Sequence, residues 1–184
     1  MPKTPLLFLA IALGVVCISL QGIAEDTPRS RDNLPKIETS DAFNKLKDLI
    51  GDWQGKLERS TGEVIDFKLN FALVSNGSVI IESAEEDGVQ MITTYKDRFG
   101  KLTATHYCAL GNQPMFTLAE LTDTAIDFDF DPVCGLKEGE HKFVKDWKIN
   151  HDPKNADVLV TEYLVINEDK SLETSVGNLK RVTK

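Results

Sequence analysis

The chain has 184 residues, and its 29 Asp and Glu residues against 21 Lys and Arg residues give a formal net charge of −8. This length corresponds to one ordinary domain, because domains commonly run to about 100–200 residues. A hydrophobic fraction of 41% is enough to bury a core, which excludes a chain that is disordered by composition. The acidic balance also argues against a nucleic-acid partner, since a polyanion repels an acidic surface.

The first segment has the pattern of a secretory signal peptide. Lys3 precedes an uncharged apolar run at residues 6–20, which is shorter than the roughly 20 residues of a membrane-spanning helix. Gly22 and Ala24 place small residues at the −3 and −1 positions of a cleavage site. We therefore expect cleavage after Ala24 and export to the periplasm or the extracellular space, with no stable membrane span afterwards. An uncleaved membrane anchor is the alternative.

Removal of residues 1–24 changes the composition. It takes away Lys3 and Cys17, and leaves 160 residues with two cysteines and a net charge of −9. Polar residues and prolines follow at 25–39, which is typical of a flexible linker. We expect the folded domain over residues 40–184.

One short helix is expected at the start of this domain. Ser40 is a suitable N-cap, and apolar residues follow it at helical spacing. These apolar residues are Phe43, Leu46, Leu49 and Ile50. The pattern predicts a helix of two to three turns that ends at Gly51.

After Gly51 the hydrophobic pattern has a period of two, as in antiparallel strands with one buried face. Asn76-Gly77 predicts a tight turn, and Asp87-Gly88 and Phe99-Gly100 separate the next strands. The expected strands lie at 65–73, from 79, at 91–96, 102–110, 115–121, 125–131, 143–150, 157–166 and 172–182. The aspartates Asp127, Asp129 and Asp131 alternate with apolar residues and fit the solvent face of a strand.

Eight to ten short strands with few helices predict an all-β fold, either an antiparallel up-and-down β-barrel or a sandwich. The single apolar face favours the barrel, because a barrel closes its own edges. A barrel of this size can hold a small molecule in its interior. A solidly packed interior is the alternative, because several large side chains face inward: Phe67, Phe71, Phe128, Phe130 and Trp147.

Two residues far apart in the chain are expected to meet. Trp53 follows Gly51 at the exit of the helix, and Arg181 lies on the last strand, which neighbours the first strand in a closed barrel. A guanidinium stacked on an indole is favourable by about 0.5–2 kcal/mol. The Gly-x-Trp after a short helix, together with a C-terminal Arg, resembles the lipocalin-type (calycin) barrels. We expect structural roles for Trp53 and Arg181.

The sharpest local motif is His-Tyr-Cys at 106–108, followed by Gly-Asn-Gln-Pro at 111–114. It is similar to a motif of uncharacterised, mostly bacterial lipocalin-like domains, and the resemblance covers about residues 43–182. The resemblance implies a lipocalin-like barrel but no settled activity. In that family a basic residue often follows the proline, whereas this chain has Met115.

Strand geometry gathers a candidate ligand site around this motif. His106 and Cys108 are two residues apart and face one side, with Ala104, while Tyr107 faces the other. The expected ligand-binding set is His106, Cys108, Asn112, Gln113, Tyr95 and Glu82. A mostly apolar pocket with a few polar groups is the usual make-up of a small-ligand site. The alternative is a buried histidine bonded to a backbone carbonyl or to Glu82, with Asn-Gln-Pro forming a turn.

No cofactor is identified by the sequence. His106 and His141, with Cys108 or Glu82, form a conceivable metal set, but no tight ligand spacing supports it and no metal ligands are assigned. Nitrobindin-type barrels resemble the chain in size and in the Trp motif, and they bind haem through an axial histidine on a late strand. Here the late histidines, His141 and His151, only flank the strand at 143–150, so haem is a minor alternative.

The two cysteines that remain after cleavage are candidates for a disulfide. Cys108 and Cys134 would meet in an oxidising compartment, and a bridge closing about 27 residues adds about 3 kcal/mol in the chain-entropy model. No residue set argues for catalysis, although His106 could serve as an acid or base. The function expected from the sequence is an exported lipocalin-like protein that binds a small, largely apolar molecule. The alternatives are an exported enzyme with the same cavity, a haem barrel and a packed interaction domain. The oligomeric state is left open.

Overall fold

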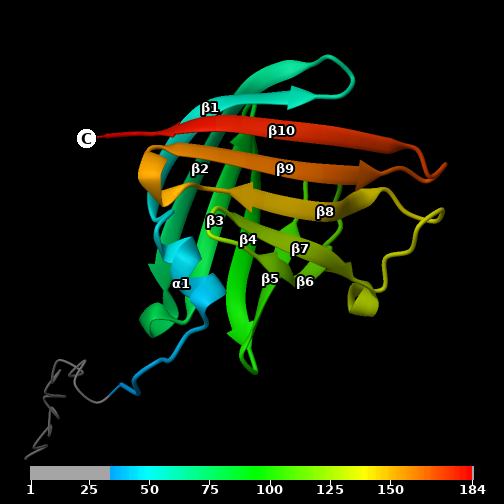
Figure 1. Ribbon diagram of the computed structural model, residues 1–184. Coiled ribbons are helices and arrows are strands. Elements are labelled where there is room, and N and C mark those ends of the chain that lie inside the picture. Colours follow the sequence, from blue (N-terminus) through cyan, green and yellow to red (C-terminus); the bar gives the residue numbers. More distant parts are fainter. Residues whose placement is uncertain (1–33, 184) are drawn as a thin grey trace, which may run out of the picture. The chain divides into compact units, whose positions relative to one another are not determined.

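A computed structural model describes residues 34–183, and these residues form a closed antiparallel β-barrel with one helix (Figure 1). The predicted signal peptide and residues 25–33 of the predicted linker lie outside the described residues. The helix is α1 (Asp41–Lys47). The ten strands are β1 (Gly51–Arg59), β2 (Val64–Val74), β3 (Val79–Glu86), β4 (Val89–Arg98), β5 (Lys101–Tyr107), β6 (Met115–Leu121), β7 (Ala125–Asp131), β8 (Phe143–Asn150), β9 (Val158–Ile166) and β10 (Leu172–Arg181).

The strands follow an up-and-down topology, which confirms the predicted barrel. Each strand pairs with the next one along the chain, and β1 pairs with β10 to close the sheet. Because neighbours are antiparallel, odd-numbered strands start at the end of the barrel where α1 packs, here called the closed end. They finish at the opposite end, here called the open end (Figure 1).

The helix is anchored at the closed end by its first turn. The Ser40 hydroxyl accepts a 3.1 Å hydrogen bond from the backbone N–H of Phe43, as expected of an N-cap. The Asp97 carboxylate at the end of β4 accepts two more bonds, from the backbone N–H and the hydroxyl of Ser40, at 2.6 and 2.8 Å. Ala42 and Phe43, on the inner face of the helix, are buried, so α1 covers the base of the barrel.

The helix ends earlier than its hydrophobic spacing predicts. It stops at Lys47, and Leu49 and Ile50 belong to the connection that enters β1. The physical reason is that Arg181 donates hydrogen bonds to the carbonyls of Asp48 and Ile50, which a continuing helix would have used internally. Gly51 then takes a φ of 124°, which permits the sharp turn into the strand.

Trp53 and Arg181 meet at the closed end, as the sequence predicts. They are direct partners in the β1–β10 register, and the guanidinium lies 4.2 Å from the indole centroid. The indole N–H of Trp53 donates a 2.8 Å bond to the carbonyl of Leu49, and the ring is 1% exposed. This contact ties the first strand, the last strand and the exit of the helix together.

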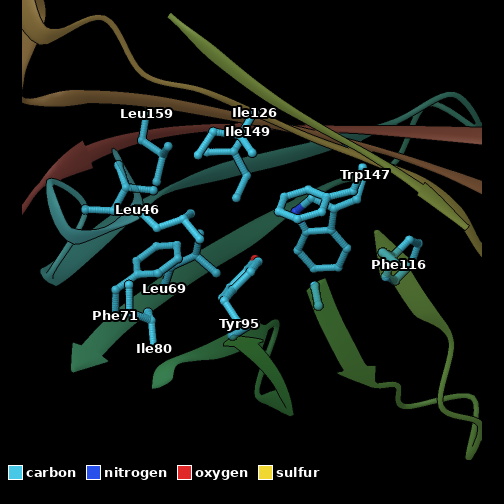
Figure 2. Close-up of a cluster of buried hydrophobic side chains, with 14 of the residues drawn as sticks. Leu46, Leu69, Phe71, Ile80, Tyr95, Phe116, Ile126, Trp147, Ile149 and Leu159 are labelled. Atoms are coloured by element: carbon cyan, nitrogen blue, oxygen red, sulfur yellow. The ribbon is translucent and has the colours of Figure 1, made fainter. Parts of the chain in front are cut away.

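Apolar side chains fill the closed half of the barrel. Figure 2 shows the buried apolar cluster of the whole barrel, in which Leu46 from the helix lies with the closed-half strand residues Phe71 and Ile80. The alternation predicted for β2 is present, since Phe67, Leu69 and Phe71 are all buried. The expectation of a packed interior therefore holds for this half, while the open half differs.

One predicted turn is wrong in detail. Asn76-Gly77 does not make a tight two-residue turn, because Val74 pairs with Val79 and leaves residues 75–78 as a longer loop. Asp87-Gly88 and Phe99-Gly100 do form tight turns, each with positive φ at both residues. These are the dihedrals of a type I′ hairpin turn.

Candidate functional site

Three polar side chains form a row across the inner face of β3, β4 and β5. Glu82 is the register partner of Thr93, and Thr93 is the partner of His106. Their exposed fractions are only 1%, 1% and 3%, respectively. Strand alternation predicts this placement, because residues two apart share a face and His106 shares one with the buried Ala104.

A second row faces the interior from the other side of the barrel. Trp147 on β8 is the register partner of Tyr163 on β9, Tyr163 is the partner of Ser175 on β10, and Ser175 is the partner of Arg59 on β1. A β-bulge between Val144 and Asp146 shifts the alternation of β8. The rings of Trp147 and Tyr163 lie 5.4 Å apart, and Trp147 lies 5.1 Å from the ring of His106.

Between these rows the open half of the barrel contains a cavity of about 280 Å³. Its apolar lining comes from Phe67, Ala84, Met91, Val144, Trp147 and Val165. Its polar lining includes Glu82, His106, Tyr163 and Ser175. This combination of apolar walls with a few inward polar groups is the usual make-up of a small-molecule site, although the volume is just below the usual range of about 300–1,000 Å³.

The Glu82 carboxyl is the most perturbed acid of the cavity. Burial raises the pKa of Glu82 to about 7, and a hydrogen bond from Tyr95 opposes the shift only in part. The Tyr95 hydroxyl donates to Oε2 of Glu82 across 2.6 Å. Among the described residues no hydrogen bond reaches the other oxygen, Oε1. Glu82 therefore offers one free acceptor in a cavity wall.

His106 is neutral at physiological pH. Burial lowers the pKa of His106 to about 4, because the charged imidazolium is desolvated. Its Nδ1 is hydrogen-bonded to the Thr93 hydroxyl at 2.9 Å, so the partner is neither a carbonyl nor Glu82. Within residues 34–183 its Nε2 has no hydrogen-bond partner, so it can exchange one bond with a ligand.

Two ion pairs line the mouth at the open end. Arg59 binds Glu86 with a distance of 2.7 Å from Nη2 to Oε2, and Tyr163 donates a 2.6 Å bond to the other oxygen of Glu86. Lys142 lies 3.3 Å from Glu173. Burial, followed by the nearby Glu86 and Glu82 carboxylates, raises the pKa of Tyr163 well above its ordinary value. The cationic groups of the mouth are therefore already neutralised by carboxylates.

The structure brings together some of the predicted ligand-binding residues and separates others. His106, Cys108 and Glu82 line the cavity, and Tyr95 supports it through Glu82. Asn112 does not line it, because its amide donates a 2.7 Å bond to the carbonyl of Lys142 at the rim.

Gln113 is also outside the cavity, since it is exposed. Its segment forms the β5–β6 turn, held by bonds from the backbone N–H of His106 to the carbonyl of Pro114 and from Cys108 to Asn112. The Gly-Asn-Gln-Pro motif therefore builds a turn, which is the structural alternative raised by the sequence.

The predicted Cys108–Cys134 disulfide is not formed in the structure, where both thiols are free. Cys108 follows β5 and Cys134 follows β7, with β6 between them. Burial also raises the pKa of the Cys108 thiol, the opposite of what an activated nucleophile needs.

The other histidines do not complete a haem or metal site. His141 accepts a bond from the backbone N–H of Lys137, and His151 packs edge-on against Trp53 at the closed end. A haem does not fit, because a cavity of about 280 Å³ is smaller than a pocket for a typical drug-sized ligand. Over residues 34–183, no three His, Cys, Asp or Glu side chains converge as a metal-binding group.

Sequence reasoning missed Arg59, Glu86 and Tyr163 as parts of the site. A signal for each was present in the alternation of its strand. Arg59 lies on the same inward-facing side of β1 as Trp53 and Leu57. Glu86 lies on the same side of β3 as Glu82. Their meeting depends on the closure of the barrel, which no local pattern reveals.

A larger hollow of about 820 Å³ lies elsewhere, on the outer surface. It is lined mainly by outward-facing residues such as Lys68, Asn70 and Tyr107. His106 and Glu82 do not line it, so we place the candidate site in the smaller interior cavity.

No protein-family profile matches the chain, and no curated protein sequence matches it. Solved structures match its fold. A protein of unknown function from the DUF3598 family of Nostoc punctiforme has 14% identity and a TM-score of 0.55 over 74% of this chain. The chain spans 49% of the length of that protein. The family resemblance seen in the His-Tyr-Cys motif is thus not confirmed, while the predicted antiparallel up-and-down β-barrel is.

Two further structures have lower similarity. EF1p2_mFAP2b bound to DFHBI has 10% identity and a TM-score of 0.38 over 77% of this chain and 99% of its own length. A redesigned β-barrel has 14% identity and a TM-score of 0.33 over 80% of this chain and 100% of its own. In the part of the chain that the structure describes, no helix is long and apolar enough to cross a membrane.

Proposed function

We propose that this protein binds a small, largely apolar molecule in the cavity of the open half, with His106 and Glu82 orienting it. One observation carries the proposal. The barrel is packed in its closed half but leaves about 280 Å³ in its open half, where two buried polar side chains each keep one atom without a protein hydrogen bond. A ligand that enters the cavity can hydrogen-bond to these two atoms, because both side chains line it.

The apolar walls supply the affinity in this proposal. Burial of apolar ligand surface contributes about 25 cal/mol per Å², and Phe67, Met91 and Val165 present such surface. The polar atoms then select orientation and chemistry, because a ligand that leaves them unpaired loses the cost of their desolvation.

The two tryptophans of the chain provide a built-in test. Trp147 lines the cavity, whereas Trp53 is sealed at the closed end with its indole N–H bonded to Leu49. In a two-dimensional ¹⁵N–¹H spectrum, titration with small amphipathic compounds should shift the indole resonance of Trp147 and leave that of Trp53 in place. The Trp147→Phe variant assigns the two signals.

Blocking the cavity is the matched control. Ala84→Phe places a large side chain in the lining and should abolish the titration, whereas Ala119→Phe on the exposed face of β6 should preserve it. Equal shifts of both indole resonances, or a response that survives Ala84→Phe in the folded protein, would contradict binding in the cavity.

We also propose export, which is supported by the leader pattern of residues 1–24. Expression of the full chain in a bacterial host, followed by mass spectrometry of the periplasmic fraction, tests this. The expected product begins at Glu25, and an intact chain confined to the cytoplasm would contradict it.

A further inference from the structure

We infer that the ligand of the cavity is a small organic cation, such as a primary ammonium compound, that pairs with Glu82 between aromatic rings. This inference rests on the proposed function, because it names the class of molecule for the same cavity. It follows from the charges that line the cavity, the free carboxyl oxygen and the rings that surround it.

The charges of the cavity lining do not balance among the described residues. The cations are Arg59 and Lys142, which pair with Glu86 and Glu173. Glu82 has no cationic partner, and its hydrogen-bonding neighbour is the neutral hydroxyl of Tyr95. His106 is neutral because burial lowers its pKa to about 4. One carboxyl group is therefore left for a cation from outside the protein.

The free oxygen of Glu82 can accept a hydrogen bond from a ligand. An ammonium group carries three donors and no acceptor, so it complements Oε1 directly. A bond between charged partners is about twice as strong as one between neutral groups. A carboxylate ligand would place a second negative charge beside Glu82, which costs free energy in a low-dielectric interior.

The aromatic rings favour the same class of ligand. Trp147 and Tyr163 lie 5.4 Å apart with an interplanar angle of 32°, and Phe67 belongs to the same lining. Ring faces attract cations, most strongly at desolvated sites. The net charge of −8 on the chain also raises the local concentration of cationic molecules.

The charge state of Glu82 sets the pH dependence. The titratable groups that share its cavity are Tyr163, His106, Cys108 and the Arg59–Glu86 and Lys142–Glu173 pairs at the mouth, and Tyr95 bonds to it directly. Burial raises the pKa of both tyrosines and lowers that of His106, so none of these three changes charge between pH 6 and 8. Glu82, with a pKa of about 7, ionises within this window.

Three probes with one skeleton separate the ligand classes: phenethylamine, phenethyl alcohol and hydrocinnamate. Titrations of the full chain are followed at the Trp147 indole resonance. At pH 8 we expect the amine to bind about tenfold more tightly than the alcohol, and hydrocinnamate to bind most weakly. Between pH 8 and pH 6 the amine should lose about tenfold in affinity while the alcohol changes little, because Glu82 takes up a proton.

Two variants that each remove one carboxylate test whether Glu82 is the group that binds the amine. Glu82→Gln should reduce the preference for the amine over the alcohol to within about twofold. Glu85→Gln is the matched control. Glu85 lies on the same strand as Glu82 but on its outer face, where it pairs with Lys68. It should keep the tenfold preference.

The outcomes separate this inference from the proposed function. Binding of the alcohol or of hydrocinnamate as tightly as the amine would overturn the cationic ligand but leave ligand binding intact. A preference for the amine that persists in Glu82→Gln would exclude Glu82 as its partner. Silence of Trp147 toward all three probes and toward uncharged apolar compounds would count against both.

Discussion

The Tyr95 hydroxyl donates a 2.6 Å hydrogen bond to Oε2 of Glu82, and both side chains are 1% exposed. Figure 2 shows Tyr95 and Trp147 within the same interior cluster, with the Tyr95 hydroxyl directed into the barrel. The bond lies where the packed closed half meets the open half, so it contributes both to stability and to the shape of the candidate site.

Tyr95→Phe removes this donor and should destabilise the protein more at high pH than at low pH. A hydrogen bond to a charged acceptor contributes about 1.5–3 kcal/mol, and one between neutral groups about 0.5–1.5 kcal/mol. Because the pKa of Glu82 is about 7, we expect the larger loss at pH 8 and the smaller one at pH 5. Urea unfolding at both pH values measures the difference. Tyr107→Phe, on the exposed face of β5, is the control. Equal losses at the two pH values would contradict the assignment.

Glu82 and His106 should affect the pH dependence of stability in opposite directions. The folded pKa of Glu82, about 7, lies above its ordinary 4.5, so the folded state binds more protons and stability falls as pH rises from 4.5 to 7. The folded pKa of His106, about 4, lies below its ordinary 6.5, so stability rises with pH from 4 to 6.5. Each effect amounts to about 3 kcal/mol, and they largely cancel between pH 4.5 and 6.5.

Single variants should reveal the two opposing effects. Glu82→Gln leaves the His106 effect, so its free energy of unfolding should rise between pH 4.5 and 6.5 relative to the parent protein. His106→Asn leaves the Glu82 effect, so its free energy of unfolding should fall over the same range. Urea midpoints at a series of pH values provide the measurement, and Glu85→Gln should follow the parent profile. The same direction of change in both variants would refute the prediction.

Arg181→Ala should be strongly destabilising, although the side chain lies at the chain end. Its guanidinium stacks on Trp53 and donates to the carbonyls of Asp48, Ile50 and Ala156. Loss of the stacking and of these bonds should cost about 2–4 kcal/mol, measured by urea unfolding. Lys180→Ala removes a neighbouring exposed charge and should cost less than about 0.5 kcal/mol. Arg181→Lys should recover only part of the loss, because an ammonium group lacks the planar set of N–H donors with which the guanidinium binds several carbonyls at once.

Phe99→Asn should stabilise the protein. Phe99 is fully exposed and has a φ of 53°, in the left-handed region that is unfavourable for a bulky side chain. Asn-Gly is the preferred sequence for this type I′ turn, so we expect a gain of about 0.5–1 kcal/mol. Thermal unfolding measures it, with Asp87→Asn in the neighbouring hairpin expected to be nearly neutral. A lower melting temperature for Phe99→Asn would contradict the prediction.

Much of the fold follows from local patterns in the sequence. Alternation along each strand predicts which side chains face inward, as at Phe67, Leu69 and His106. The Ser40 cap and the Trp53–Arg181 pair were predictable because each depends on a local signal or on the simple closure of first strand on last. The helix end was not, because the competing hydrogen bonds to Asp48 and Ile50 come from Arg181 at the other end of the chain.

The candidate site divides in the same way. The sequence alone indicates that Glu82 and His106 each lie on the inner face of their own strand, because a strand has a side-chain period of two. Strand alternation also indicates that Arg59, Glu86 and Tyr163 lie at inward-facing positions of their strands. Only the tertiary structure decides that these three meet at the mouth, since strands far apart in the sequence face each other across a barrel whose register is set by closure. For the same reason it alone decides that Glu82 lacks a cation while Arg59 and Lys142 have carboxylates.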